Sequence, residues 1–328
     1  MFRKPLFILI VLAIALTACA PAATPPPQEI ATPIPVTPMA APSLEPSPEL
    51  GGIYMDALGR SLTVSTKPMR IVSLAPSVTE ILFAIGAGPQ VVGRTKFCNY
   101  PPEVASIAEV GGFSAKSISI EAILALEPDL VIAGSKSQRE VVAALEDQGI
   151  TVFTLAPETL ADIESGILTL GQITSNVAQA ESVVADMQTR ITAVNTKIET
   201  IPAEKRLRVF YEVWHEPLTT TTQSTFIGEV LMLAGTVNIF GELQGTYPEV
   251  SAEQIFEMDP QAIVGPSSHS DQLTAQVIGT RPGWDRLSAI KNNAVYIVDS
   301  EMISRGGPRI VDALEAIAGM LYPGLFGG

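Results

Sequence analysis

Side chains that often carry catalysis are sparse in this sequence, and their spacing matches no common catalytic arrangement. The chain has no G-x-S-x-G nucleophile elbow, no G-x-x-x-x-G-K-[ST] phosphate loop and no H-E-x-x-H metal-binding motif. Its 2 histidines, His215 and His269, are too few for a His-rich zinc or manganese site. We expect the Ser-Ser-His run at 267–269 to be a loop. We therefore expect no enzymatic activity, no resident cofactor and no bound metal.

Two glutamates, Glu121 and Glu253, lie in closely similar sequence surroundings. Residues 119–134 read SIEAILALEPDLVIAG, and residues 251–265 read SAEQIFEMDPQAIVG. In both, a serine that can cap a helix precedes the glutamate, and a proline ends the helix before an apolar strand. The glutamate then lies in the first helical turn, near the positive end of the helix dipole. Each half of the chain therefore contains a comparable strand–helix unit, which indicates two lobes of similar design.

Short apolar strands alternate with helical stretches along residues 51–328. We expect strands at 70–74, 91–93, 130–133, 152–155, 207–212, 263–264 and 295–298. The run Ser77-Val78-Thr79-Glu80 fits the S-x-x-E capping box, which predicts a helix start there and a structural role for Glu80. The alternation predicts an α/β fold with parallel sheets covered by helices on both faces.

A long amphipathic helix is expected between the two halves. Its apolar residues recur at alternating spacings of three and four: Val177, Ala180, Val184, Met187, Ile191, Val194, Ile198 and Ile201. Such a stripe could also belong to a coiled-coil dimer. Because it lies between two α/β halves, we favour one helix that crosses both lobes and limits their motion.

The first 20 residues have the pattern of an export signal. Arg3 and Lys4 precede the apolar stretch 6–16, which is too short to span a bilayer. The run Leu-Thr-Ala-Cys at 16–19 resembles a bacterial lipobox, which implies cleavage before Cys19 and lipid attachment to it. We therefore expect an exported protein, lipid-anchored to the outer face of the cytoplasmic membrane.

A proline-rich segment follows the predicted lipidation site. Residues 21–50 contain no Lys or Arg and are too rich in proline to form a packed unit. Such a segment is expected to act as an extended tether of up to about 90 Å. With Cys19 lipidated, Cys98 has no partner for a disulfide, and we expect it to be a buried free thiol.

The composition excludes two further classes of protein. Lys and Arg number 20 against 34 Asp and Glu, which gives a net charge of −14, whereas nucleic-acid recognition needs a basic face. The 2 cysteines exclude a disulfide-knit scaffold. Hydrophobic residues make up 47% of the chain and charged residues 16%, which is typical of a globular protein with a full core.

Several segments resemble the cobalamin and iron-siderophore (class III) group of ABC-importer binding proteins. They are 70–88 (RIVSLAPSVTEILFAIGAG), the stretch 91–102 and 121–133 (EAILALEPDLVIA). Segments 211–240 and 298–309 are most similar to the cobalamin branch. The resemblance covers about 70–328 and implies two Rossmann-like lobes joined by one long rigid helix. It also implies a receptor that captures cobalamin or a related corrinoid between the lobes and delivers it to a membrane permease and its ATPase.

The resemblance implies a set of site residues. Flat aromatic rings suit the face of a corrin or porphyrin. The pocket positions of the cobalamin branch fall on Phe97, Phe113, Trp214 and Glu301. We expect Tyr100, Tyr247 and Arg305 to be neighbours of these residues in the site. Glu121 and Glu253 match two acidic residues expected to pair with arginines of the permease, one from each lobe as a two-fold partner requires. The alternative is that both glutamates only complement helix dipoles.

The expected division of the chain is 1–18 (signal peptide), 19–50 (lipid-anchored linker), 51–160 (N-terminal lobe), 161–204 (helical connector) and 205–328 (C-terminal lobe). We expect a monomer. The alternative ligands are an iron-siderophore and haem. The scarcity of Lys and Arg in the candidate loops favours a corrinoid over an anionic siderophore, whereas His215 beside Trp214 keeps haem open. An anchored enzyme and a sensor or adhesion module are the alternatives from other classes.

Overall fold

A computed structural model describes residues 52–327, apart from the side chain of His269. The predicted signal peptide, the lipidation site Cys19 and the whole predicted linker 19–50 lie outside the described residues. Among the described helices, none is both long and apolar enough to cross a membrane.

The first lobe is built on a five-stranded parallel sheet with strand order β5-β4-β3-β6-β7. Its strands are β3 (Ile71–Ser73), β4 (Val91–Arg94), β5 (Ala108–Glu109), β6 (Leu130–Ala133) and β7 (Val152–Thr154). An antiparallel pair, β1 (Gly52–Met55) and β2 (Ser61–Val64), precedes them. The expected strands are present because each is a short apolar run buried on both faces of the sheet.

Helices cover both faces of this sheet. They are α1 (Pro76–Ala84), α2 (Ile120–Ala125), α3 (Arg139–Glu146) and α4 (Leu160–Thr174). One face of the sheet shares a core with α1 and α4, through residues such as Ile132, Ile81 and Ile163. The opposite face packs against α2 and α3, through Val131 and Val141 among others.

The second lobe repeats this arrangement around a four-stranded parallel sheet with order β11-β8-β12-β13. The strands of this lobe are β8 (Leu207–Tyr211), β9 (Trp214–His215), β10 (Leu218–Thr219), β11 (Thr236–Asn238), β12 (Ala262–Pro266) and β13 (Val295–Val298). Its helices are α6 (Phe226–Leu233), α7 (Ala252–Met258), α8 (Ala275–Gly279), α9 (Ser288–Lys291), α10 (Ser300–Ile303), α11 (Ile310–Leu321) and α12 (Pro323–Phe326). Helices α6, α10 and α11 pack on one face of the sheet, and α7, α8 and α9 on the other.

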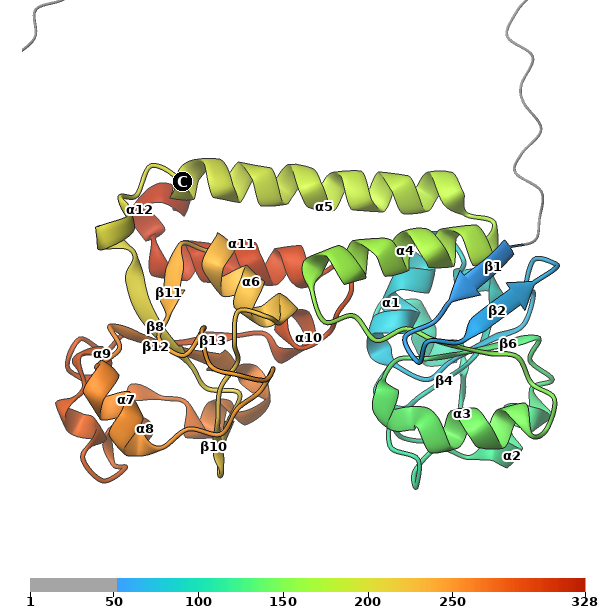
Figure 1. The fold of residues 1–328 in the computed structure, drawn as a ribbon, viewed down its shortest axis with the longest axis horizontal. Helices are drawn as coiled ribbons and strands as arrows, with labels where there is room; N and C mark the ends of the chain where they lie inside the picture. The colour runs from blue at the N-terminus through green and yellow to red at the C-terminus, as the bar shows by residue number, and fades with distance from the viewer. Residues whose placement is uncertain (1–51, 328) are drawn as a thin grey trace, which may run out of the picture. The chain divides into compact units, whose positions relative to one another are not determined.

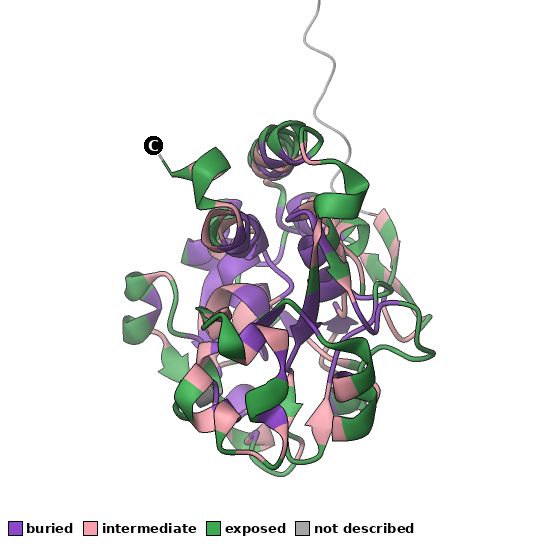
Figure 2. Ribbon diagram, turned by 90° about the vertical axis from the view of Figure 1, so that its left-hand side faces the viewer, coloured by how far each residue is buried: buried purple, intermediate pink, exposed green. Residues whose placement is uncertain are grey.

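A single long helix, α5 (Val177–Ile198), crosses both lobes (Figure 1). It packs against α1 and α4 in the first lobe and against α6 and α11 in the second. The residues it buries all belong to the predicted stripe: Ala180, Val184, Met187, Val194 and Ile198. Figure 2 shows that buried residues concentrate on the strands and the inner faces of the helices. The predicted fold class, two lobes with parallel sheets joined by one long helix, is confirmed.

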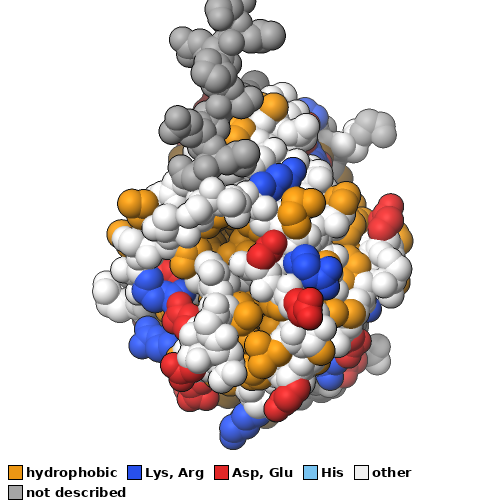
Figure 3. Space-filling model, turned by 90° about the vertical axis from the view of Figure 1, so that its right-hand side faces the viewer, with side chains coloured by type: hydrophobic (Ala, Val, Ile, Leu, Met, Phe, Trp, Pro, Cys, Tyr) orange, Lys and Arg blue, Asp and Glu red, His pale blue; other side chains and the backbone are white. Residues whose placement is uncertain are grey.

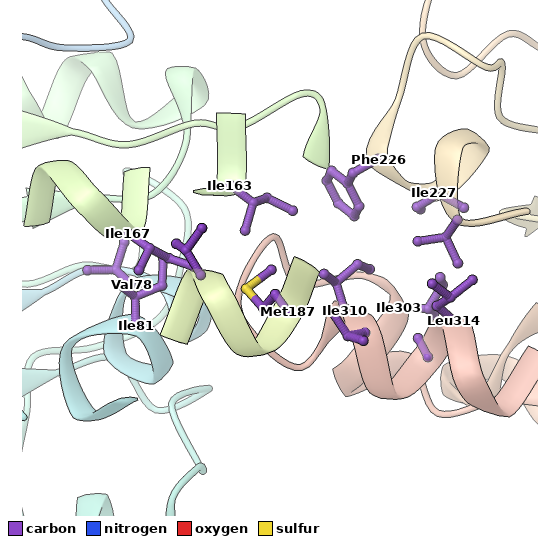
Figure 4. Packing of buried hydrophobic residues seen from close by; sticks show 14 of the residues in the cluster. Val78, Ile81, Ile163, Ile167, Met187, Phe226, Ile227, Ile303, Ile310 and Leu314 are labelled. Carbon is purple, nitrogen blue, oxygen red and sulfur yellow. The ribbon is translucent and has the colours of Figure 1, made fainter. Parts of the chain in front are cut away.

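The two lobes share one continuous apolar core on the side of α5. Ile163 of α4 and Met187 of α5 lie between the first lobe and Ile310 of α11 (Figure 4). Because protein cores are densely packed, this shared core opposes a wide hinge motion between the lobes.

Polar contacts hold α5 to both lobes. Its Gln188 amide donates to Glu164 of α4 at 2.9 Å. The Arg190 guanidinium donates to Glu315 at 2.6 and 2.9 Å and to Asp312 at 2.5 Å, both on α11. The hydrogen bonds from Arg190 hold the pKa of the Glu315 carboxyl below its usual value. The helix is therefore fixed to a neighbouring helix in each lobe, as expected of a helix that limits the motion of the lobes.

Two helix boundaries differ from the sequence-based expectation. Helix α1 begins at Pro76, with Ala75 as its N-cap, and no side chain caps it, so the predicted Ser77–Glu80 capping box is wrong. Proline is preorganised for the first helical position, which moves the start one residue earlier. Helix α5 ends at Ile198 rather than Ile201, because Pro202 disfavours helical geometry in the residue before it.

Cys98 is buried and free, as predicted, and its Sγ lies 3.2 Å from the Thr95 hydroxyl.

Candidate functional site

A cavity of about 610 Å³ lies between the two lobes. Much of its lining comes from segments that directly follow strands in both sheets. Ala75 follows β3, Phe97 follows β4 and Gly134 follows β6, and Glu301 lies in α10 directly after β13. The carboxyl ends of parallel strands are where α/β proteins bind ligands. The cavity is within the size range of small-molecule sites. We call this space, lined by residues of both lobes and of the segment 156–158, the inter-lobe cavity.

Three phenylalanines form the aromatic part of the inter-lobe cavity. Phe97 and Phe113 come from the first lobe, and Phe226 comes from the start of α6 in the second. The Phe97 ring is 48% exposed, whereas Phe226 is buried. An exposed aromatic ring at a cavity gains contact area when a flat apolar surface covers it. This arrangement can hold one broad, partly apolar ligand between the lobes.

A charged network closes one side of the cavity. Glu80 on α1 is almost fully buried and accepts hydrogen bonds from Arg305 at 2.7 Å and from Arg309 at 2.8 and 2.9 Å. Arg305 also donates to the Asn99 side chain at 2.8 Å and to Glu301 at 3.1 Å, and the Asn99 amide donates to Glu301. The network therefore links the first lobe to the segment before α11 in the second, and it fixes Arg305 at the cavity wall.

A second ion pair lies on the cavity wall away from this network. Lys136 follows β6, and Glu158 lies in the segment that leads to α4. The Lys136 ammonium lies 2.6 Å from a Glu158 carboxylate oxygen, and about half of each side chain is exposed. Both cations of the described lining therefore have carboxylate partners.

The structure brings four of the seven predicted ligand residues together in the inter-lobe cavity and places three outside its lining. Those in the lining are Phe97, Phe113, Glu301 and Arg305. Tyr100 lines a neighbouring cavity of about 450 Å³, where the Arg309 guanidinium lies 4.1 Å from its ring centre. Trp214 lies on the hairpin β9–β10, with its indole N–H donating to the Glu216 carbonyl at 2.9 Å. Tyr247 lies close to Thr225, the residue before the lining Phe226.

The two predicted docking glutamates occupy equivalent positions in the two lobes. The Ser119 hydroxyl caps α2 by accepting from the Ala122 N–H at 3.1 Å, and Ser251 caps α7 by accepting from Gln254 at 3.3 Å. Both glutamates are exposed in the first turns of these helices. For Glu253, hydrogen bonds from its own backbone N–H and from Ser251 lower the carboxyl pKa. Both helices start at the carboxyl edge of their sheets, because each one precedes a parallel strand.

The end face of the first lobe shows no large region of one charge sign. Acidic and basic side chains are interspersed on it (Figure 3). Recognition of a partner on this side would therefore depend on individual residues rather than on a broad electrostatic field.

Sequence reasoning did not identify several residues of the site. They are Glu80, as the hydrogen-bond acceptor of two arginines, Asn99, and the ion pair Lys136–Glu158. Glu80 lies 225 residues before Arg305, and no local pattern links them. Within the described part of the chain, no group of three or more His, Cys, Asp or Glu residues could hold a metal ion.

Comparison with known proteins agrees with this geometry. The sequence pattern of the periplasmic binding protein family matches residues 71–302. The chain is 32% identical over 276 residues to the uncharacterised ABC transporter substrate-binding lipoprotein YvrC of Bacillus subtilis, covering 83% of this chain and 85% of the relative. It is 32% identical to a vitamin B12-binding protein of Vibrio cholerae, covering 76% and 87%. The crystal structure of the periplasmic vitamin B12 binding protein BtuF of Vibrio cholerae superposes with a TM-score of 0.65 at 30% identity, covering 78% of this chain and 97% of that one.

Proposed function

This chain is a member of the periplasmic binding protein family, and we propose that it captures cobalamin or a related corrinoid in the inter-lobe cavity for an ABC importer. The observation that carries the proposal is the inter-lobe cavity itself, with Phe97 and Phe113 at the carboxyl edge of one sheet and Phe226 opposite. Flat aromatic side chains bury a broad apolar surface at a low cost in conformational entropy. Relatives named for vitamin B12 binding support this choice of ligand.

The chemistry of the lining favours a corrinoid over haem and over an anionic siderophore. Haem iron takes an axial His, Tyr, Met or Cys ligand. The described part of the lining contains none of these four residue types, and its aromatic residues are phenylalanines. A ferric siderophore of high negative charge needs positive charge in its site, yet Lys136 and Arg305 are both paired with carboxylates. Haem and iron-siderophore complexes are therefore the second choice.

Delivery to a membrane permease and its ATPase completes the proposed role. Glu121 and Glu253 offer one exposed carboxylate from each lobe, which suits arginines on a two-fold permease. We propose that the protein acts as a monomer and that lipid on Cys19 holds it at the outer face of the cytoplasmic membrane. The relative YvrC, named as a lipoprotein, supports the anchor.

Cyanocobalamin is expected to bind the purified protein with a sub-micromolar Kd. Binding should change the visible absorption spectrum of the cyanocobalamin. The Phe97→Ala variant should bind about tenfold more weakly, because roughly 60 Å² of apolar contact is worth about 1.4 kcal/mol. Titration of both proteins with cyanocobalamin, haem, a ferric catecholate and a ferric hydroxamate shows which ligand binds. The same titrations measure how much the substitution lowers the affinity.

The matched control is Phe326→Ala, which removes an aromatic ring on α12, outside the cavity lining. Its cyanocobalamin affinity should equal that of the wild type. Tight binding of haem or a ferric complex, with no binding of cyanocobalamin, would reject the corrinoid proposal.

A further inference from the structure

The charges that line the inter-lobe cavity balance within the described residues. Its charged lining residues are Lys136 and Arg305 on the positive side and Glu158 and Glu301 on the negative side. The sum is therefore +2 − 2 = 0 at pH 7. A binding site for a highly charged anion would instead be expected to expose unpaired cations.

Arg305 is held on several sides. Its guanidinium contacts Glu80 at 2.7 Å and Glu301 at 3.1 Å, and only 14% of its side chain is exposed. Glu80 also binds Arg309 and so cannot neutralise Arg305 alone: two arginines face one buried carboxylate. Glu301 supplies the second negative charge that balances the cluster.

Lys136 shows the same pattern with a single partner. Its ammonium lies 2.6 Å from Glu158, and both groups line the cavity. Because this pair is half exposed, it contributes little to folding stability. The pair still affects the charge of the cavity, because the Glu158 carboxylate lies beside the Lys136 ammonium whether or not the pair stabilises the fold.

We propose that Glu158 and Glu301 are specificity-determining residues, which neutralise Lys136 and Arg305 and so exclude anionic ligands from the inter-lobe cavity. The inference rests on the proposed function, because it takes this cavity as the ligand site. It adds that selectivity against anions comes from carboxylates placed beside cations, so that an anion meets negative charge where it needs positive charge. Building repulsion against unwanted ligands is a general route to specificity.

The test is a charge-neutral substitution of both carboxylates. The variant Glu158→Gln/Glu301→Gln leaves the shape of the cavity nearly unchanged and changes its net charge from 0 to +2. We expect a ferric tris-catecholate trianion to bind this variant at least about tenfold more tightly than the wild type. The gain should shrink as salt rises from about 0.05 M to 0.5 M, because salt screens exposed charges. Cyanocobalamin, which has no net charge, should show no salt-dependent gain of this kind.

The matched control is Glu204→Gln, which removes the charge of an exposed glutamate outside the cavity lining. It should leave anion binding at the wild-type level. Circular dichroism checks that each variant folds, and the single variant Glu158→Gln, in a half-exposed pair, serves if the double variant does not.

The inference is overturned if the substituted protein binds the trianion no better than the wild type, including the case in which neither binds it. It is also overturned if Glu204→Gln gives an equal gain. The proposed function fails separately, if the wild type does not bind cyanocobalamin, whatever the substituted protein does with the anion.

Discussion

Replacing Glu80 by alanine is expected to destabilise the protein by about 3 kcal/mol, the largest effect of any single substitution considered. The Glu80 side chain is 2% exposed and binds two arginines that are each 14% exposed. Removing the carboxylate leaves two neighbouring cations with little water around them. The unfolding midpoint measured by calorimetry should fall by roughly 6–12 °C.

A triple variant separates charge from packing. In Glu80→Leu/Arg305→Met/Arg309→Met all three charges are replaced by apolar groups, and replacement of whole buried ion clusters is often close to neutral. We expect this variant to recover much of the stability lost in Glu80→Ala. A loss below about 1 kcal/mol in Glu80→Ala would show that the network does not hold the lobes together.

Reversing the charges of Glu121 and Glu253 together is expected to reduce permease association by at least about 100-fold, or 2.8 kcal/mol. Each substitution, Glu121→Arg and Glu253→Arg, would replace an attraction to a permease arginine with a repulsion. Affinity for cyanocobalamin should stay at the wild-type level, because neither residue lines the inter-lobe cavity. Binding to permease reconstituted in nanodiscs measures the first effect, and calorimetry measures the second.

The control for this experiment is the pair Glu140→Arg and Glu257→Arg, two exposed glutamates on the neighbouring helix α3 and on α7. It applies the same change of net charge away from the first turns of α2 and α7. If both pairs weaken association equally, the effect is one of overall charge and the docking proposal is wrong. If the Glu121 and Glu253 pair loses ligand binding and unfolds, the two residues are structural.

The fold could be predicted from the sequence because its helices and strands have strong apolar patterns. The strands at 130–133 and 295–298 occur as predicted, and the stripe of α5 marks the residues that the helix buries. Boundaries were less accessible where proline acts against a pattern. Pro76 moves the start of α1, and Pro202 ends α5 while Ile201 still packs against the core.

The site was only partly accessible, because its contacts join residues far apart in the chain. The resemblance to the cobalamin branch predicted Phe97 and, as a neighbour, Arg305, and both residues line the cavity, where loops after parallel strands meet at one edge. It also predicted Trp214, which lies on the hairpin β9–β10 outside the lining. The partners of Glu80 lie 225 and 229 residues away, and only the packing of the lobes brings them together.

The central claim is that a corrinoid occupies the cavity between the lobes. A crystal structure of the protein with cyanocobalamin, with data collected at the cobalt absorption edge, tests it most directly. The account predicts one strong anomalous peak in the inter-lobe cavity, with the corrin plane against Phe97 or Phe113. A cobalt peak elsewhere on the molecule, with this cavity filled only by water, would contradict it.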